Sequence, residues 1–283
     1  MSSTEIYRWG ATQRRISDEG EAARKEALAW LETNADDNAG AEITLKAVPN
    51  TSGCLALARE GGDVLGVAVG AGPTVYLEAL EARQIWPLLD DVSEGLVRVW
   101  CPPKLAEEAQ AWMASNGGFS GSQEFQVLRS ARLSESPLDA KETIHSNASH
   151  EGARPATMGD LEALDEYGLG FKEECGFVLT RDWPGAIGRG EVAVIESDGV
   201  VASFAMKFGQ TSRLSTIGGG WTRPDARRQG LAAGVTCFLL EQVLTNRPTV
   251  QVLVNEGNVA GIGLYHFLGF GRSGSLSCLT RAT

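Results

Sequence analysis

Residues 215–254 contain the pattern that constrains the fold most: a strand, a turn, a helix and a second strand in succession. An apolar stretch that includes three consecutive glycines runs to Thr222, and Pro224 fixes a turn after it. Apolar side chains then recur at helical spacing from about residue 229 to 245. The segment TVQVLV follows, and such a β-branched run is typical of a strand buried on both faces. We therefore expect the helix to be a crossover between parallel strands of one sheet.

The rest of the chain extends this pattern into two halves. Residues 191–208 predict a hairpin. Earlier in the chain, Asp160 is a candidate N-cap for the helix that begins directly after it. Both halves end with the same succession of predicted elements: a strand, a helix, a Gly-Phe pair and a strand. We expect an α/β fold with central mixed sheets flanked by helices. The polar residues 136–151 predict a linker between an N-terminal domain, 1–135, and a C-terminal domain, 152–283.

Composition narrows the classes of function. The formal net charge of −11 argues against a general nucleic-acid binder, which usually presents a basic surface. No run of eighteen apolar residues occurs, and the N-terminal segment lacks the apolar core of a signal peptide, so we expect a cytoplasmic protein without a membrane span. The five cysteines form no CxxC pair and there are only three histidines, which predicts reduced thiols and no metal site.

The turn before the helix has the chemistry of an anion site. The first amides of a helix lack partners within the helix, and together with the helix dipole they favour an anion. Gly230 has no Cβ, so a phosphate can approach the backbone there, and Arg227 and Arg228 add positive charge. Taken alone, the Arg-x-x-Gly-x-Ala pattern fits an ordinary helix start with solvated arginines better than an anion site.

The glycines in the preceding strand favour a ligand. Three glycines weaken a strand unless a backbone or ligand must come close, and a bulge there would separate the strand from its neighbour. A linear ligand with amide groups could pair with the exposed edge, as an added strand does. Such a cleft would bind phosphate at one end and amide groups along its length. Coenzyme A has both, in its pyrophosphate and its pantetheine arm.

The segments GGGWTRPDARRQGLAAGVTCFLLEQVL and VQVLVNEGNVAGIGLYHFLGFGRSG resemble motifs A and B of the GNAT superfamily of N-acetyltransferases. The first half has no motif A and resembles a degenerate GNAT-like copy, as in tandem members of the superfamily. The resemblance implies acetyl-CoA as the cofactor. It implies that the pantetheine arm meets the strand and the pyrophosphate meets the turn. The implied cofactor-binding residues are Gly220, Trp221, Thr222, Arg227, Arg228, Gln229, Gly230, Leu231, Ala232, Ala233, Asn258 and Tyr265.

Three residues are candidates for catalysis. Tyr265 lies two helical turns after Asn258, and its hydroxyl could protonate a departing thiolate as a general acid. Packing of Tyr265 in the core and capping of the helix by Asn258 are the alternatives. Many GNAT members carry a glutamate on the strand before motif A, and this chain has none there. Glu173 or Glu174 could replace it, although both fit solvated positions on a helix surface slightly better.

The resemblance implies an N-acetyltransferase that moves an acetyl group from acetyl-CoA to a primary amine by direct attack in a ternary complex. The acceptor would be a small-molecule amine, an amino acid or a peptide, and the protein a monomer or homodimer. The missing strand carboxylate leaves an alternative, a non-catalytic acyl-CoA-binding or regulatory module.

Overall fold

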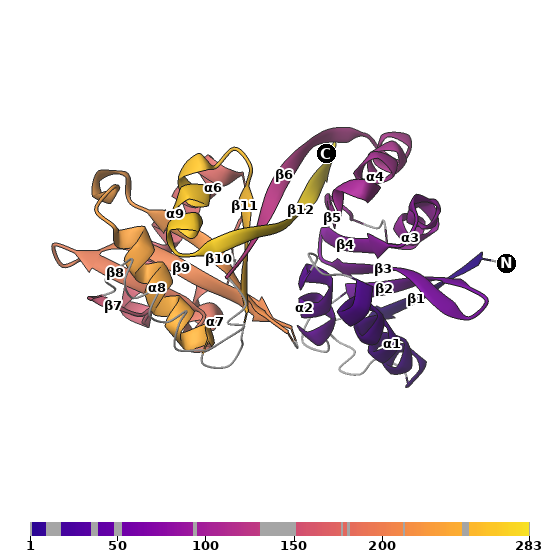
Figure 1. Cartoon of the computed structure of the whole chain (residues 1–283), viewed down its shortest axis with the longest axis horizontal. Helices are drawn as coiled ribbons and strands as arrows, with labels where there is room; N and C mark the ends of the chain where they lie inside the picture. Colours follow the sequence, from indigo (N-terminus) through magenta and orange to yellow (C-terminus); the bar gives the residue numbers. More distant parts are fainter. Residues whose placement is uncertain are drawn as a thin grey trace. The chain divides into compact units, whose positions relative to one another are not determined.

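The computed structural model describes residues 2–9, 18–34, 39–47, 53–92, 95–130, 151–176, 178–179, 182–211, 213–244 and 249–282 (Figure 1). They form two compact units. Unit 1 comprises Met1–Val127 with Ser273–Thr283, and unit 2 comprises Leu128–Arg272. The predicted linker, 136–151, lies outside the described residues except for Glu151. Among the described residues, no helix has both the length and the apolar character needed to cross a bilayer.

Unit 1 is a mixed sheet with helices packed on it. Its sheet has the order β1-β2-β3-β4-β5-β12-β6, in which β4 and β5 are parallel while β1 to β4 form an antiparallel meander. The strands are β1 (Ser2–Trp9), β2 (Gly53–Glu60), β3 (Asp63–Ala71), β4 (Thr74–Ala79), β5 (Arg98–Cys101), β6 (Phe119–Ser130) and β12 (Phe270–Arg281). The helices are α1 (Asp18–Asn34), α2 (Ala39–Ala47), the short η1 (Ala82–Gln84), α3 (Ile85–Val92) and α4 (Pro103–Ser115).

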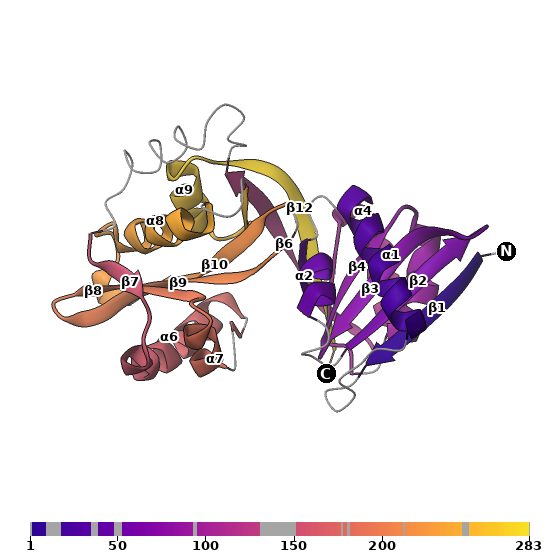
Figure 2. The ribbon, with the colours of Figure 1, turned by 90° about the horizontal axis from the view of Figure 1, so that it is seen from below.

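In unit 2 the strand order is β6-β11-β10-β9-β8-β7, with parallel and antiparallel pairs, and β6 contributes its last residues. The strands are β7 (Ala153–Pro155), β8 (Val192–Ser197), β9 (Val200–Gln210), β10 (Ser215–Thr222) and β11 (Val250–Asn255). The helices are η2 (Met158–Asp160), α6 (Leu161–Cys175), α7 (Trp183–Gly188), η3 (Pro224–Ala226), α8 (Leu231–Leu244) and α9 (Val259–Phe267). In Figure 2, α8 and α9 lie on one face of this sheet and α6 and α7 on the other.

The two faces of the unit 2 sheet bury separate cores. Val235 and Leu239 of α8 pack with Val252 of β11 on one face. Leu164 of α6 packs with Phe204 of β9 on the other. The strands β10 and β11 are parallel, so the predicted crossover and the predicted α/β class with mixed sheets are confirmed. The last strand differs from the expected layout, because residues from Ser273 onward belong to unit 1, where β12 pairs with β5.

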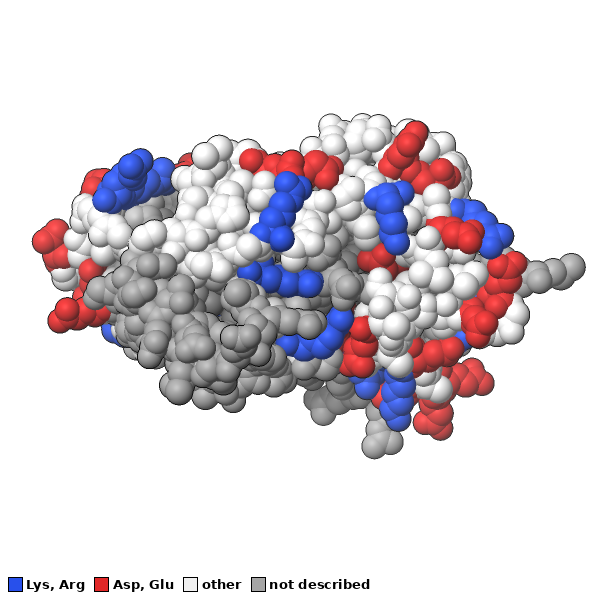
Figure 3. All heavy atoms as spheres, in the orientation of Figure 1, with Lys and Arg blue, Asp and Glu red and all other residues white. Residues whose placement is uncertain are grey.

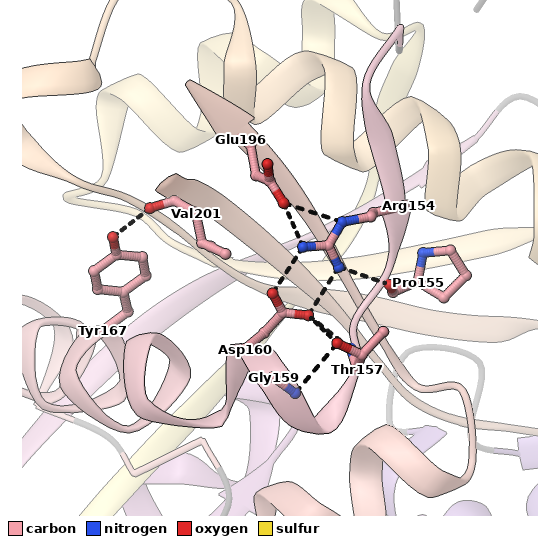
Figure 4. Close-up of polar contacts among 8 residues, drawn as sticks. All are labelled: Arg154, Pro155, Thr157, Gly159, Asp160, Tyr167, Glu196 and Val201. Atoms are coloured by element: carbon pink, nitrogen blue, oxygen red, sulfur yellow. Dashed lines mark hydrogen bonds and ion pairs between the residues drawn. The ribbon is translucent and has the colours of Figure 1, made fainter. Parts of the chain in front are cut away.

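Helix α6 is fixed to the sheet by a polar cluster at its N-terminus (Figure 4). The guanidinium of Arg154 donates two 2.8 Å hydrogen bonds to the carboxylate of Asp160 and also binds Glu196 of β8. Asp160 is the N-cap residue of α6, as predicted, but its side chain makes no capping hydrogen bond to that helix. The side chain instead completes the capping box of η2, in which the Thr157 side chain accepts from the Gly159 amide. The Arg154 hydrogen bonds, with those from Thr157, lower the pKa of Asp160 to about 2. Further along α6, the Tyr167 hydroxyl donates to the Val201 carbonyl.

Candidate active site

Strands β10 and β11 separate partway along their length. Their parallel pairing covers Ser215–Ile217 of β10 and Val250–Val252 of β11. Both strands continue beyond it, to Thr222 and Asn255, without further pairing between them. The edges that diverge there carry backbone donors and acceptors that a linear ligand can use. The separation predicted from the glycines is therefore present.

A bulge at the glycines produces this separation. The register between β10 and β9 shifts between Gly218 and Trp221. Gly219 has a φ of +59°, and a Cβ there would lie 2.7 Å from Leu179 Cδ2 and 2.9 Å from Phe208 Cζ. Only glycine fits both the left-handed backbone and this close packing. Leu179 and Phe208 were not anticipated from the sequence, since nothing local marks them as neighbours of the bulge.

The turn after β10 leaves its amides open. Arg228 and Gly230 have φ values of +66° and +83°, so neither is helical, and α8 begins at Leu231 rather than at the predicted residue 229. A Cβ on Gly230 would meet no atom within 4 Å. Within the described part of the chain, the amides of residues 228–233 donate no hydrogen bond, and the first helical bond joins Gly234 N to Gly230 O at 2.9 Å. These amides can therefore receive an anion.

Glu174 and two of the predicted cofactor-binding residues form one cluster. Glu174 Oε1 accepts from Trp221 Nε1 at 3.1 Å and from Arg227 Nη2 at 2.5 Å. Arg227 Nε donates to the Thr222 carbonyl at 3.0 Å, and its guanidinium lies 5.7 Å from the centroid of the Trp221 ring. Glu174 is exposed, as its interpretation as a surface charge requires, but it is also bound by Trp221 and Arg227. Glu173 fits that interpretation, because it is exposed and contacts no other described side chain through a hydrogen bond or ion pair.

The Trp221 indole packs on α6. Its ring centroid lies 5.0 Å from that of Tyr167, and a Cβ on Gly170 would lie 2.6 Å from Trp221 Cζ2. Gly168, two residues earlier on the same helix, makes room in the same way for the buried Trp183. The two glycines of the helical sequence YGLGF carry a signal that was missed, because glycine inside a helix is costly unless something packs against it.

Asn258 and Tyr265 occupy the two positions predicted on α9. Asn258 is the N-cap, and its Oδ1 accepts from the Gly261 amide at 2.8 Å, so the capping role is confirmed. The cap leaves the Nδ2 donors for a ligand. Tyr265 is buried, and its ring meets Phe270 edge-on at 5.5 Å between centroids. Burial raises the pKa of Tyr265 to about 12, so its hydroxyl keeps its proton at neutral pH.

The corresponding helix start in unit 1 is closed by its own side chains. There β4 and β5 are parallel, and η1 and α3 follow β4. Glu81 and Gln84 form a capping box, in which the Glu81 amide donates to Gln84 Oε1 at 2.9 Å, and Ile85 is fully buried. A carboxylate at this position repels an anion and occupies the amides that would bind it.

The charges and the metal-binding capacity limit the chemistry further. On the surface shown in Figure 3, acidic and basic side chains are interspersed over the described residues. No group of three or more His, Cys, Asp or Glu side chains that could hold a metal occurs among the residues that the structure describes. The candidate site in unit 2 consists of the open anion turn, the separated strands β10 and β11, and the buried phenol of Tyr265.

The chain is similar in fold to proteins of known structure. Residues 205–276 match the family model FR47-like protein. No curated protein matches the chain by sequence. Among solved structures, the chain is similar to an acetyltransferase of the GNAT family from Colwellia psychrerythraea, with 14% identity, a TM-score of 0.59 and coverage of 98% of this chain and 100% of that one. A tandem GNAT protein from the clavulanic acid biosynthesis pathway has 16% identity, a TM-score of 0.56 and 98% coverage of both chains.

A GCN5-related N-acetyltransferase from Sphaerobacter thermophilus is similar at 15% identity, with a TM-score of 0.56 and coverage of 98% of this chain and 94% of that one. At these identities the similarity concerns the fold. Because it extends over nearly the whole chain, it confirms the GNAT fold expected from the two motifs of the second half and the tandem arrangement expected from the GNAT-like first half.

Proposed function

From this tandem GNAT fold, we propose that unit 2 binds acetyl-CoA and transfers its acetyl group to a primary amine by direct attack in a ternary complex. One observation carries the proposal: the separation of β10 from β11 ends beside a turn whose amides are open. The separated strands match the amide-bearing pantetheine arm, and the turn matches the pyrophosphate. When bound, the cofactor supplies an activated thioester.

The described residues then have distinct tasks. The amides of residues 228–233 bind the pyrophosphate, and the β10 backbone from Gly220 to Thr222 pairs with the arm. Asn258 Nδ2 donates to the same arm. A β10 amide near Trp221 stabilises the negative charge that develops on the thioester oxygen during attack.

Tyr265 completes the proton balance of the transfer. As the amine nitrogen bonds to the carbonyl carbon, the C–S bond breaks and its electron pair remains on sulfur. The Tyr265 hydroxyl donates its proton to this sulfur, and the proton lost by the nitrogen restores the phenol. Because its pKa is raised to about 12, Tyr265 holds this proton at neutral pH.

The proton of the incoming ammonium leaves to water in this proposal. Strand β10 carries no carboxylate, and Glu174 Oε1 is already bound by Trp221 and Arg227. Glu173 has no role in the proposal.

The acceptor remains a small-molecule amine, an amino acid or a peptide, and the protein a monomer or homodimer. We also propose a cytoplasmic location, with which cysteines that form no disulfide in the described part of the chain are consistent.

Calorimetric titration with acetyl-CoA tests the cofactor claim. Gly230→Ala and Gly230→Glu both strain the left-handed backbone, and only the second adds a carboxylate to the anion turn. We expect Gly230→Glu to abolish binding and Gly230→Ala to weaken it less. Unchanged affinity in Gly230→Glu would defeat the proposal. Thiol release across a panel of amines then separates an enzyme from a module that only binds the cofactor.

A further inference from the structure

The guanidinium of Arg227 is held on the side of the turn that faces α6. It makes an ion pair with Glu174 at 2.5 Å and donates to the Thr222 carbonyl at 3.0 Å. Both side chains of the pair are accessible, at 41% for Arg227 and 46% for Glu174. An accessible ion pair of this kind is weak and can be exchanged for a stronger one.

A pyrophosphate at residues 228–233 would compete with Glu174 for this guanidinium. Arg227 is the residue immediately before the open amides, and arginine binds phosphate with two parallel hydrogen bonds. A pyrophosphate carries more negative charge than a carboxylate. The same side chain therefore has two anionic partners, one in the protein and one in the cofactor.

We propose that Glu174 and Arg227 form a latch that cofactor binding opens: Arg227 leaves Glu174 for the pyrophosphate, and the released carboxylate binds the ammonium group of the acceptor. The inference rests on the proposed function of unit 2. It makes Glu174 a positioning residue and assigns the acceptor to the protonated amines.

The surroundings of Glu174 hold the carboxylate in place after the exchange. Trp221 Nε1 continues to donate to Glu174 Oε1, and the Trp221 ring stays packed against Tyr167 and Gly170 of α6. Tyr167 is itself bonded to the Val201 carbonyl of β9. The released negative charge therefore stays beside the β10 segment where the thioester is expected, and a cationic amine can replace Arg227 as its partner.

The latch predicts that removing the carboxylate strengthens cofactor binding. Glu174→Gln keeps a hydrogen-bond acceptor for Trp221 but releases Arg227 without an ion pair to break. Since an accessible pair is weak, we expect the Kd for CoA to fall by about two- to fivefold. Glu173→Gln is the matched control: it removes the same charge one residue away, from a side chain that points about 100° around the helix.

The test is a double-mutant cycle read by calorimetric titration with CoA at one fixed salt concentration. The proteins are the parent, Glu174→Gln, Arg227→Gln, the double variant and Glu173→Gln. We expect tighter binding in Glu174→Gln, weaker binding in Arg227→Gln, and no effect of Glu174→Gln once Arg227 is absent. Equal affinities in Glu174→Gln and Glu173→Gln, or weaker binding in Glu174→Gln, would overturn the latch. If the parent binds no CoA, the proposed function fails instead.

Discussion

Adding one methyl group to α6 at Gly170 should disturb the candidate cofactor cleft from outside it. A Cβ at Gly170 would lie 2.6 Å from Trp221 Cζ2 and 3.1 Å from Trp221 Cε2. Carbon atoms in contact prefer about 3.5–4.0 Å, so the indole must move by about 1 Å. Because the Trp221 main chain is where the pantetheine arm is proposed to pair, this movement should reach the ligand.

Stability and binding should respond to Gly170→Ala with different magnitudes. Alanine gains about 1 kcal/mol over glycine in a helix interior, whereas overpacking costs about 1–3 kcal/mol, so the net loss of stability is at most about 2 kcal/mol. Loss of one backbone hydrogen bond to the arm costs about 1 kcal/mol, or about fivefold in the Kd for CoA. Urea unfolding and calorimetric titration measure the two effects.

Gly168→Ala is the matched control on the same helix. A Cβ there would lie 3.1 Å from Trp183 Cζ2, so the neighbour has to move by only a few tenths of an ångström. Trp183 belongs to the core rather than to the predicted cofactor residues. We expect stability within about 1 kcal/mol of the parent and CoA affinity within about twofold. Equal CoA affinities in the two alanine variants would refute the reasoning.

Three further outcomes follow from single residues. The Asp160 pKa, lowered from 3.8 to about 2, implies about 2 kcal/mol of stability that is present above pH 3.8 and lost as the pH falls to 2. Asp160→Asn should remove this dependence in urea titrations, and an unchanged acid limb would contradict it. Tyr265→Phe should slow thiol release at least about 100-fold and leave the CoA affinity within about twofold of the parent. In the parent protein, a rate of thiol release that falls between pH 8 and 10 because the Tyr265 hydroxyl loses its proton would be inconsistent with its pKa of about 12. Arg228→Gly should be about 1 kcal/mol more stable than Arg228→Ala, because the φ of +66° strains any residue with a Cβ. Both variants should bind CoA equally weakly. Equal stabilities of the two variants would show that the backbone strain is relieved elsewhere.

The parts of the site that lie close together in the sequence could be predicted from it. The glycines of β10, the open turn at Gly230 and the crossover through α8 depend on backbone preferences and helical spacing within some forty residues. The start of α8 was placed two residues too early because helical periodicity does not report the left-handed φ at Gly230. The position of Asp160 before α6 predicts a cap, but the ion pair of its side chain with Arg154 cannot be read from helix-capping patterns.

Contacts between distant segments could not be predicted. Glu174 and Arg227 are separated by 53 residues, so the sequence shows two surface charges where the fold makes one ion pair. The pairing of β12 with β5 joins the last strand of the chain to the first half, which composition and periodicity cannot indicate. Both contacts are set by tertiary packing rather than by local propensity.

Amide chemical shifts give the most direct test of the claim that residues 228–233 bind the cofactor pyrophosphate. A deuterated, ¹⁵N-labelled sample would be titrated with CoA and, separately, with pantetheine, which lacks the pyrophosphate. We expect CoA to shift the amides of residues 228–233 together with those of Gly220 to Thr222, and pantetheine to shift only the latter. Shifts from CoA that leave residues 228–233 unchanged, or that appear at the Glu81 to Ile85 turn of unit 1 instead, would contradict the account.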